Sequence, residues 1–207
     1  MAKEGRCGVF ATPPVFLCKT NALGRLTAQE PRSCAASPGA DRTYVHVDGR
    51  LTLESWLDGI RRGRTFASTG PIVFLDVAGH EPGDQIELPA HAPETLHVHV
   101  DATSIAPMDS LVIVVNGVSA RTIPAKDPLH IVFDGAIAIP HGGWIAARVD
   151  GPSSRYVWDT YAFAQTSPVY VVRGGVQWRS AADARFLEQA VEATWERVAN
   201  APWRSAD

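Results

Sequence analysis

The sequence predicts a mainly β protein: an antiparallel, immunoglobulin-like β-sandwich with a short helix before it and an amphipathic helix at the C-terminal end. Three observations support this prediction. Short apolar or alternating segments recur at close intervals between residues 71 and 172, turn signals such as Pro82-Gly83-Asp84 and Asn116-Gly117 separate them, and no helical pattern intervenes. A parallel βαβ fold would instead show a helical pattern between successive strands.

The strands are predicted from alternation. Residues 96–102 place His97, His99 and Asp101 on one face and apolar side chains on the other, and residues 129–134 alternate in the same way. Each of these two segments is therefore expected to have one buried and one solvated face. Further strands are predicted at 43–48, 71–77, 111–115, 144–149 and 169–172.

The short first helix has a start signal, an apolar stripe and a stop signal. Thr52 occupies the position of an N-cap, and Gly63 follows where a left-handed residue ends many helices. Between them the apolar residues recur at helical spacing, at Leu53, Trp56, Leu57 and Ile60. We expect an exposed apolar surface around Trp56, Leu57 and Ile60, where a further domain would sit.

The C-terminal helix is predicted from Ser180, which can cap it with Asp183 three residues later, to Pro202. Its apolar residues form one stripe, which is expected to pack on the sandwich or on a neighbouring domain. The stripe comprises Phe186, Leu187, Ala190, Val191, Trp195 and Val198.

The patterns divide the chain into four parts. Residues 1–40 are predicted to be irregular, 41–71 form a strand and a helix, 72–178 form the sandwich, and 179–201 form the last helix. Cys7, Cys18 and Cys34 show neither a disulfide framework nor a Cys-x-x-Cys pair, so reduced thiols and a cytoplasmic location are expected. The apolar stretch near the N-terminus contains Pro13 and Pro14 and is not expected to be a signal peptide.

Composition excludes two classes of partner. The formal net charge is −3, so there is no strong positive field to attract nucleic acid or an anionic membrane. No run of apolar residues reaches the roughly 20 that a membrane-spanning helix needs.

The strongest candidate for metal chemistry is the pair His97 and His99, whose side chains project to the same side of a predicted strand. A metal site of this kind needs further ligands and groups that orient them, and the neighbouring residues continue the alternation instead. The pair is therefore interpreted as polar residues on a solvated face. The other histidines have no paired spacing and are expected at the surface: His46, His80, His91, His130 and His141.

No catalytic residue is assigned from the sequence, which has no nucleophile elbow, P-loop or Gly-x-Gly-x-x-Gly motif. Arg148 is the one candidate on the substrate side, because its guanidinium could meet a carboxylate or a carbonyl; a surface ion pair is the alternative. Exposed tryptophans among Trp144, Trp158 and Trp178 could bind carbohydrate, although core and edge positions are the preferred interpretation.

Several segments, taken in order, resemble the C-terminal portion of CehA/McbA-type metallohydrolases of the polymerase-and-histidinol-phosphatase (PHP) superfamily. RTYVHVDG at 42–49, WLDGI at 56–60 and GRTFASTGP at 63–71 resemble the stretch that closes the PHP domain. The later segments are similar to the β-rich region that follows it: PGD at 82–84, LVIVVNG at 111–117, WIAARV at 144–149 and FAQTSPVYV at 163–171.

The resemblance implies hydrolysis of ester or amide bonds at a divalent metal site, with zinc, manganese or iron as the metal. The family's ligands belong to an upstream PHP domain, and the resemblance here begins near residue 39, so no ligand is carried over and no cofactor is expected in this chain. Gln165 stands where the family's segment would carry a histidine. A truncated, mis-started or split product would each explain this pattern.

Three functions are compatible with these observations. The first is an accessory region that packs against a PHP catalytic domain or a second subunit and helps to shape its pocket. The second is an independent carbohydrate- or partner-binding sandwich. The third is an active metallohydrolase with an unrecognised site. The sequence leaves the natural substrate and the oligomeric state open.

Overall fold

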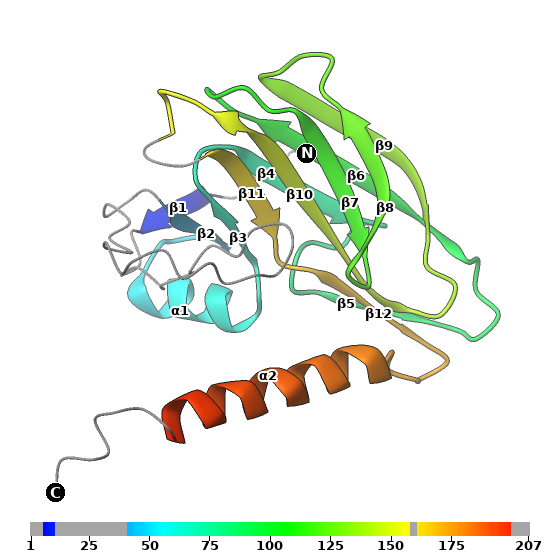
Figure 1. Ribbon diagram of the computed structural model, residues 1–207. Coiled ribbons are helices and arrows are strands. Elements are labelled where there is room, and N and C mark those ends of the chain that lie inside the picture. The colour runs from blue at the N-terminus through cyan, green and yellow to red at the C-terminus, as the bar shows by residue number, and fades with distance from the viewer. Residues whose placement is uncertain (1–5, 11–40, 158–160, 200–207) are drawn as a thin grey trace, which may run out of the picture.

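The computed structural model describes the backbone of residues 6–10 and, with their side chains, residues 41–157 and 161–199. It confirms the predicted mainly β fold: two sheets face each other, a short helix lies beside the larger sheet, and a longer helix ends the described chain (Figure 1). Neither helix in these ranges is long and apolar enough to cross a membrane.

The elements follow one another in a simple order. They are β1 (Arg6–Phe10), β2 (Arg42–Val47), α1 (Leu53–Arg61), β3 (Thr65–Ser68), β4 (Ile72–Val77), β5 (Gln85–Leu88), β6 (Thr95–Thr103), β7 (Ser110–Val115), β8 (Val118–Pro124), β9 (His130–Ala138), β10 (Gly143–Ser153), β11 (Tyr161–Thr166), β12 (Val169–Arg173) and α2 (Ala181–Ala199).

The larger sheet is organised around β10. One edge of β10 pairs with β7, and β7 pairs in turn with β8. The other edge of β10 pairs with β12 near the start of the strand and with β11 further along. The sheet extends from β11 through β3 and β2 to β1, and from β12 to β5. The pairing of β12 with β5 is parallel, whereas the other strand pairs among the described residues are antiparallel.

The smaller sheet contains three antiparallel strands in the order β4-β6-β9. Its inner face carries the apolar side chains of the alternating pattern, and Val98 and Val100 in β6 are fully buried. They belong to the same core cluster as Ile113, Ile145 and Val149 of the larger sheet. The core therefore lies between two sheets, as the alternation predicted.

Residues 42–68 form a strand–helix–strand unit that is hydrogen-bonded into the sandwich. β2 pairs with β3, and β3 pairs in turn with β11 through Phe66, Ala67 and Ser68. Tyr44 and Phe66 stack on this unit with ring centroids 4.6 Å apart. These residues thus share one sheet with the sandwich.

α1 has the predicted boundaries. The Thr52 hydroxyl accepts a hydrogen bond from the Ser55 backbone N–H, and the Ser55 side chain accepts one from Thr52 N–H, which completes a capping box. Gly63 takes the left-handed conformation with φ +71°. The helix rests on β2 at Gly59, where an added Cβ would lie 2.5 Å from a methyl carbon of Val45.

The apolar stripe of α1 is only partly exposed. Trp56 and Leu57 are half-buried, whereas Leu53 and Ile60 are exposed, and the neighbouring Leu51 is exposed as well. The apolar surface expected around Trp56, Leu57 and Ile60 is therefore present but lies more towards the ends of the helix.

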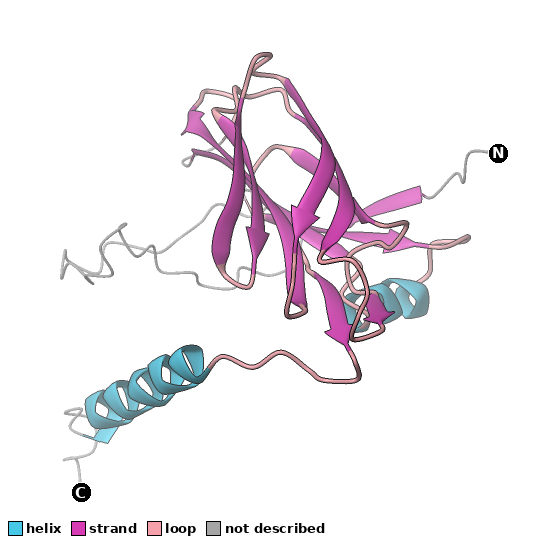
Figure 2. Ribbon diagram, turned by 90° about the vertical axis from the view of Figure 1, so that its right-hand side faces the viewer, coloured by secondary structure: helices cyan, strands magenta, loops and turns pink. Residues whose placement is uncertain are grey.

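α2 is capped as predicted, because the Asp183 backbone N–H donates to the Ser180 hydroxyl at 3.1 Å. None of its residues is buried, so its apolar stripe is not covered by the sandwich. The helix stands apart from both sheets in the two side views (Figures 1 and 2).

Five strands were not predicted, for different reasons. In β8 six of seven residues are exposed, so no alternation is visible. β3 and β5 have four residues each, and the alternation of β11 was not recognised in the sequence. The prediction that residues 1–40 are irregular is wrong at Arg6–Phe10, which form β1 and pair with β2. Residues 1–5 and 11–40, which include Cys18 and Cys34, lie outside the described ranges.

Gly83 forms the tightest contact between the strand–helix–strand unit and the sandwich. It has φ +91°, its N–H donates to the carbonyl oxygen of Pro168 at 2.8 Å, and an added Cβ would lie 1.9 Å from the Arg62 carbonyl oxygen. Only glycine fits here without moving the backbone of both segments.

Gly83→Ala should lower the free energy of unfolding by about 2–4 kcal/mol, because it adds a clash to the cost of a left-handed alanine. The matched control is Gly49→Ala: Gly49 also has a left-handed backbone, with φ +79°, but an added Cβ would meet nothing within 4 Å. Urea denaturation measures both. Equal losses in the two variants would contradict the close contact at Gly83.

Candidate functional site

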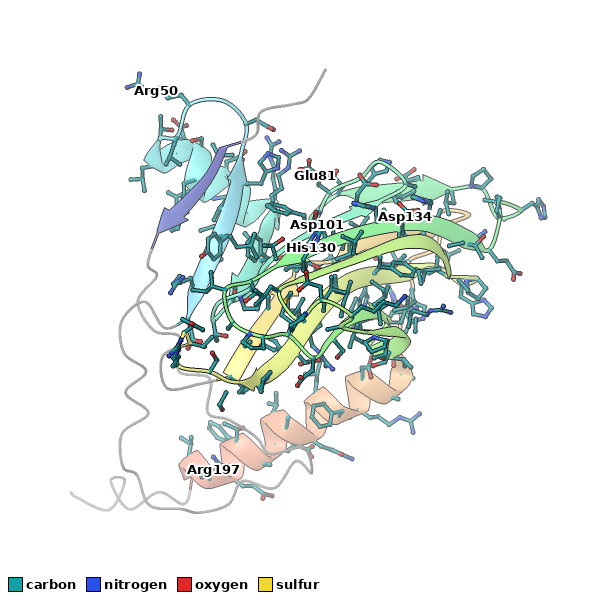
Figure 3. The ribbon with its side chains drawn as sticks, turned by 90° about the horizontal axis from the view of Figure 1, so that it is seen from above. Arg50, Glu81, Asp101, His130, Asp134 and Arg197 are labelled. Atoms are coloured by element: carbon teal, nitrogen blue, oxygen red, sulfur yellow. The ribbon has the colours of Figure 1, made fainter. Side chains whose placement is uncertain are left out.

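The outer face of the smaller sheet carries a concentration of histidine and aspartate. Because alternation buries Val98 and Val100, it places His97, His99 and Asp101 on the opposite face of β6. The neighbouring strand β9 is antiparallel and in register, so His99 lies opposite Asp134. Figure 3 shows Asp101, His130 and Asp134 on the strands of this sheet.

The two predicted metal candidates, His97 and His99, are brought together by one carboxylate. His97 Nε2 lies 3.0 Å from Oδ1 of Asp134, and His99 Nδ1 lies 3.0 Å from Oδ2. The three side chains are about half exposed, with exposed fractions of 57%, 45% and 61%. A second pair lies on the same face, where His130 Nε2 is 3.1 Å from Oδ1 of Asp101.

This arrangement holds a carboxylate between two imidazoles rather than a cation. Each imidazole uses the nitrogen that faces Asp134, and the two nitrogens bond to different oxygens. Among the described residues no group of three or more His, Cys, Asp or Glu side chains is arranged to hold a metal ion.

The structure changes the acidity of Asp134. The hydrogen bonds from His97 and His99 stabilise its charged form and lower the pKa of its carboxyl. The carboxylate therefore keeps its charge to a lower pH than an ordinary surface aspartate.

A second polar cluster lies where the strand–helix–strand unit meets the sandwich. His46 Nδ1 lies 2.5 Å from Oε2 of Glu81, which precedes β5, and His46 Nε2 lies 3.8 Å from Oδ1 of Asp48. Arg64 donates to Oδ2 of Asp48 at 2.6 Å and approaches Asp84 at 4.0 Å. Its hydrogen bond to Asp48 raises the pKa of the Arg64 guanidinium.

This junction differs from what the sequence suggested. His46 was expected to be a surface histidine, but its side chain is only 28% exposed and forms a short contact with a carboxylate 35 residues away. His80 lies 3.9 Å from Asp84 at the same junction. Only the fold brings Glu81 to His46, so the pairing has no signal in the sequence.

Arg148, the residue proposed for the substrate side, lies on the outer face of β10. Its Nε donates to Oδ2 of Asp150 at 2.9 Å, and its side chain is 39% exposed. Gln165 of β11 is directly opposite it in the register, and four residues earlier along β10 the outward-facing Trp144 is opposite Tyr170 of β12. This face therefore combines an ion pair, an amide and two aromatic rings.

Comparison with known proteins adds no identity. No family model matches the chain, and no match is found among the curated proteins or among the solved structures.

The stability of the protein should fall when the pH drops through the lowered pKa of Asp134. A carboxyl whose folded-state pKa is below its unfolded value, about 3.9, stabilises the fold above that value and loses this contribution as the folded-state group is protonated. Carbon-detected NMR titration of the Asp134 carboxyl should show its pKa rising towards the ordinary value in His97→Ala and in His99→Ala, and further in the double variant. His141→Ala, which removes an exposed histidine elsewhere, is the control; a carboxyl that titrates identically in all variants would refute the shared hydrogen bonding.

Proposed function

We propose that this chain is the accessory C-terminal β-sandwich region of a metal-dependent ester or amide hydrolase of the CehA/McbA type. In this proposal the chain acts in the cytoplasm, does not catalyse hydrolysis alone, and packs against a PHP catalytic domain that carries the zinc, manganese or iron site. The resemblance of residues 39 to 198 to that region, in order and spacing, is its starting point.

One structural observation carries the proposal furthest. The strand–helix–strand unit, which resembles the end of the PHP domain, is joined to the sandwich by the β3–β11 ladder and by the contacts of His46 with Glu81 and Gly83 with Arg62. A catalytic domain continuous with this unit would be held at a fixed position relative to the sandwich. Such rigidity is what an accessory region needs in order to shape a neighbouring pocket.

α1 offers a surface for this contact. Leu53 is 73% exposed and Ile60 is 38% exposed, and both lie on a helix whose other side rests on β2. Burial of these two side chains in a contact would remove apolar surface from water and so favour association. A PHP domain would cover them.

The experiment uses the full chain and, as a separate polypeptide, the PHP domain of a CehA/McbA-type hydrolase. We expect a complex in isothermal titration calorimetry, weakened about tenfold or more by Leu53→Asp or Ile60→Asp because each would bury an unpaired charge in the contact. Val132→Asp, on the exposed outer face of β9, is the matched control and should bind normally.

Two outcomes would overturn this proposal. One is the absence of any complex with the PHP domain. The other is hydrolysis of a nitrophenyl ester by the chain alone, in the presence of zinc, manganese or iron, that is lost on adding a chelator; this would favour an active metallohydrolase instead.

The outer face of β10 and β12 favours a second candidate function, the binding of carbohydrate. Tyr170 is 46% exposed and faces Trp144 across the strand pair, and aromatic rings next to charged and amide groups can stack on a sugar while hydrogen-bonding its hydroxyls. Arg148, Asp150 and Gln165 would supply the polar contacts.

A panel of neutral oligosaccharides tests this candidate. Saturable quenching of tryptophan fluorescence is expected if the face binds glycans, and Tyr170→Ala should abolish it. Tyr156→Ala, which removes an exposed ring that packs against Arg155 in the segment after β10, should leave the quenching unchanged. If no member of the panel quenches the fluorescence, the candidate fails.

A further inference from the structure

The apolar side chains of α2 are exposed. Phe186, Leu187 and Val191 are 67%, 62% and 69% exposed, and Trp195 and Val198 are exposed as well. The helix lies away from both sheets, as the two side views agree (Figures 1 and 2). In proteins most of the stability of an amphipathic helix comes from packing of its apolar face, so a partner surface would stabilise α2.

The spacing of the stripe fits another helix. Leu187, Val191, Trp195 and Val198 follow at intervals of four, four and three residues, which is close to the seam of a coiled coil. Ala184 and Thr194 extend the same seam. This is the periodicity of an amphipathic helix, and a second helix of the same kind is a surface that fits it.

The charges beside the seam indicate which helix. Asp183 and Arg197 are two heptads apart, so they occupy the same position beside the stripe, one near each end of α2. Arg197 is labelled on this helix in Figure 3, near its C-terminal end. If two copies of α2 pack antiparallel about a two-fold axis, Asp183 of each copy lies against Arg197 of the other.

The same arrangement pairs the middle of the seam. With Asp183 facing Arg197, Leu187 of one copy packs against Val191 of the other, Ala184 packs against Thr194, and Ala190 meets its own equivalent at the axis. Small residues at the axis allow the two helices to approach closely. One like-charge contact opposes the pairing, because Glu188 faces its own equivalent on the other side of the seam.

A parallel arrangement is less favourable. It would place Asp183 of each copy next to Glu188 of the other, which gives two like-charge contacts and no compensating ion pair at that level. The antiparallel pair instead gives two opposite-charge contacts and one like-charge contact. Electrostatics therefore selects the antiparallel, two-fold symmetric form.

We propose that α2 is a dimerisation helix, and that its partner is α2 of a second copy of this chain in an antiparallel pair closed by two Asp183–Arg197 ion pairs. The proposal is independent of the contact suggested for α1, which lies on another helix. A dimer formed through α2 leaves Leu53 and Ile60 accessible to a different domain.

Charge reversal tests the pairing directly. Sedimentation equilibrium of the full chain should show a monomer–dimer equilibrium for the wild type. Asp183→Arg and Arg197→Asp should each raise the dissociation constant by about tenfold or more, because each places two like charges in contact twice per dimer. The double variant, Asp183→Arg with Arg197→Asp, should recover the affinity of the wild type.

Mixing the two single variants gives the sharpest result. In a mixed dimer the arginine introduced at position 183 of one copy faces the aspartate introduced at position 197 of the other, and the native Asp183–Arg197 pair remains at the opposite end. The mixed dimer should therefore form more tightly than either single variant forms with itself. Glu192→Lys, on the face of α2 away from the seam, is the matched control for a charge reversal that leaves the association unchanged.

Other results would overturn the proposal. A wild type that stays monomeric at the highest concentration reached excludes a second copy as the partner of α2. A dimer that Val191→Asp leaves intact, or single charge reversals whose effects are not rescued by the double variant or by mixing, would place the contact elsewhere. Far-ultraviolet circular dichroism of each variant at low concentration separates loss of association from loss of the fold.

Discussion

The alternation of side chains along β6 is the constraint on which the rest of the structure depends. Val98 and Val100 must face the larger sheet to close the core, and they pack in one cluster with Ile113, Ile145 and Val149. Because neighbouring side chains of a strand point in opposite directions, a shift of one residue would bury His97 and His99 and expose the valines. Burial of the valines therefore places both histidines on the outer face.

The pairing of histidine with aspartate needs a second constraint, the register between β6 and β9. His99 lies opposite Asp134 because the two strands are antiparallel and aligned over nine residue pairs. Asp134 then forms hydrogen bonds with both imidazoles, and because its side chain is 61% exposed, water reaches the contact. The result is a hydrogen-bonded, solvent-accessible triad and not a desolvated centre, which limits how strongly it can act on a substrate.

The strand–helix–strand unit and α2 are attached to the sandwich in opposite ways. The unit is fixed by β3–β11 hydrogen bonds, by the approach of Gly83 to the backbone of Arg62 and by the half-buried contact of His46 with Glu81. α2 follows a connecting segment and none of its residues is buried. The first behaves as part of the sheet, whereas the second presents an apolar face that the described strands leave exposed.

The sequence alone determined the features that depend on near neighbours in the chain. The capping of α1 by Thr52, its end at Gly63, the hairpin at Asn116-Gly117 and the two faces of β6 follow from local backbone geometry and side-chain period. The tertiary structure decided what depends on distant residues. It brought Asp134 to His97 and His99 and Glu81 to His46, and it added β1, β3, β5, β8 and β11 to the sheets. Strand order and register are set by packing of the whole core, and no short pattern encodes which carboxylate will lie opposite a given histidine.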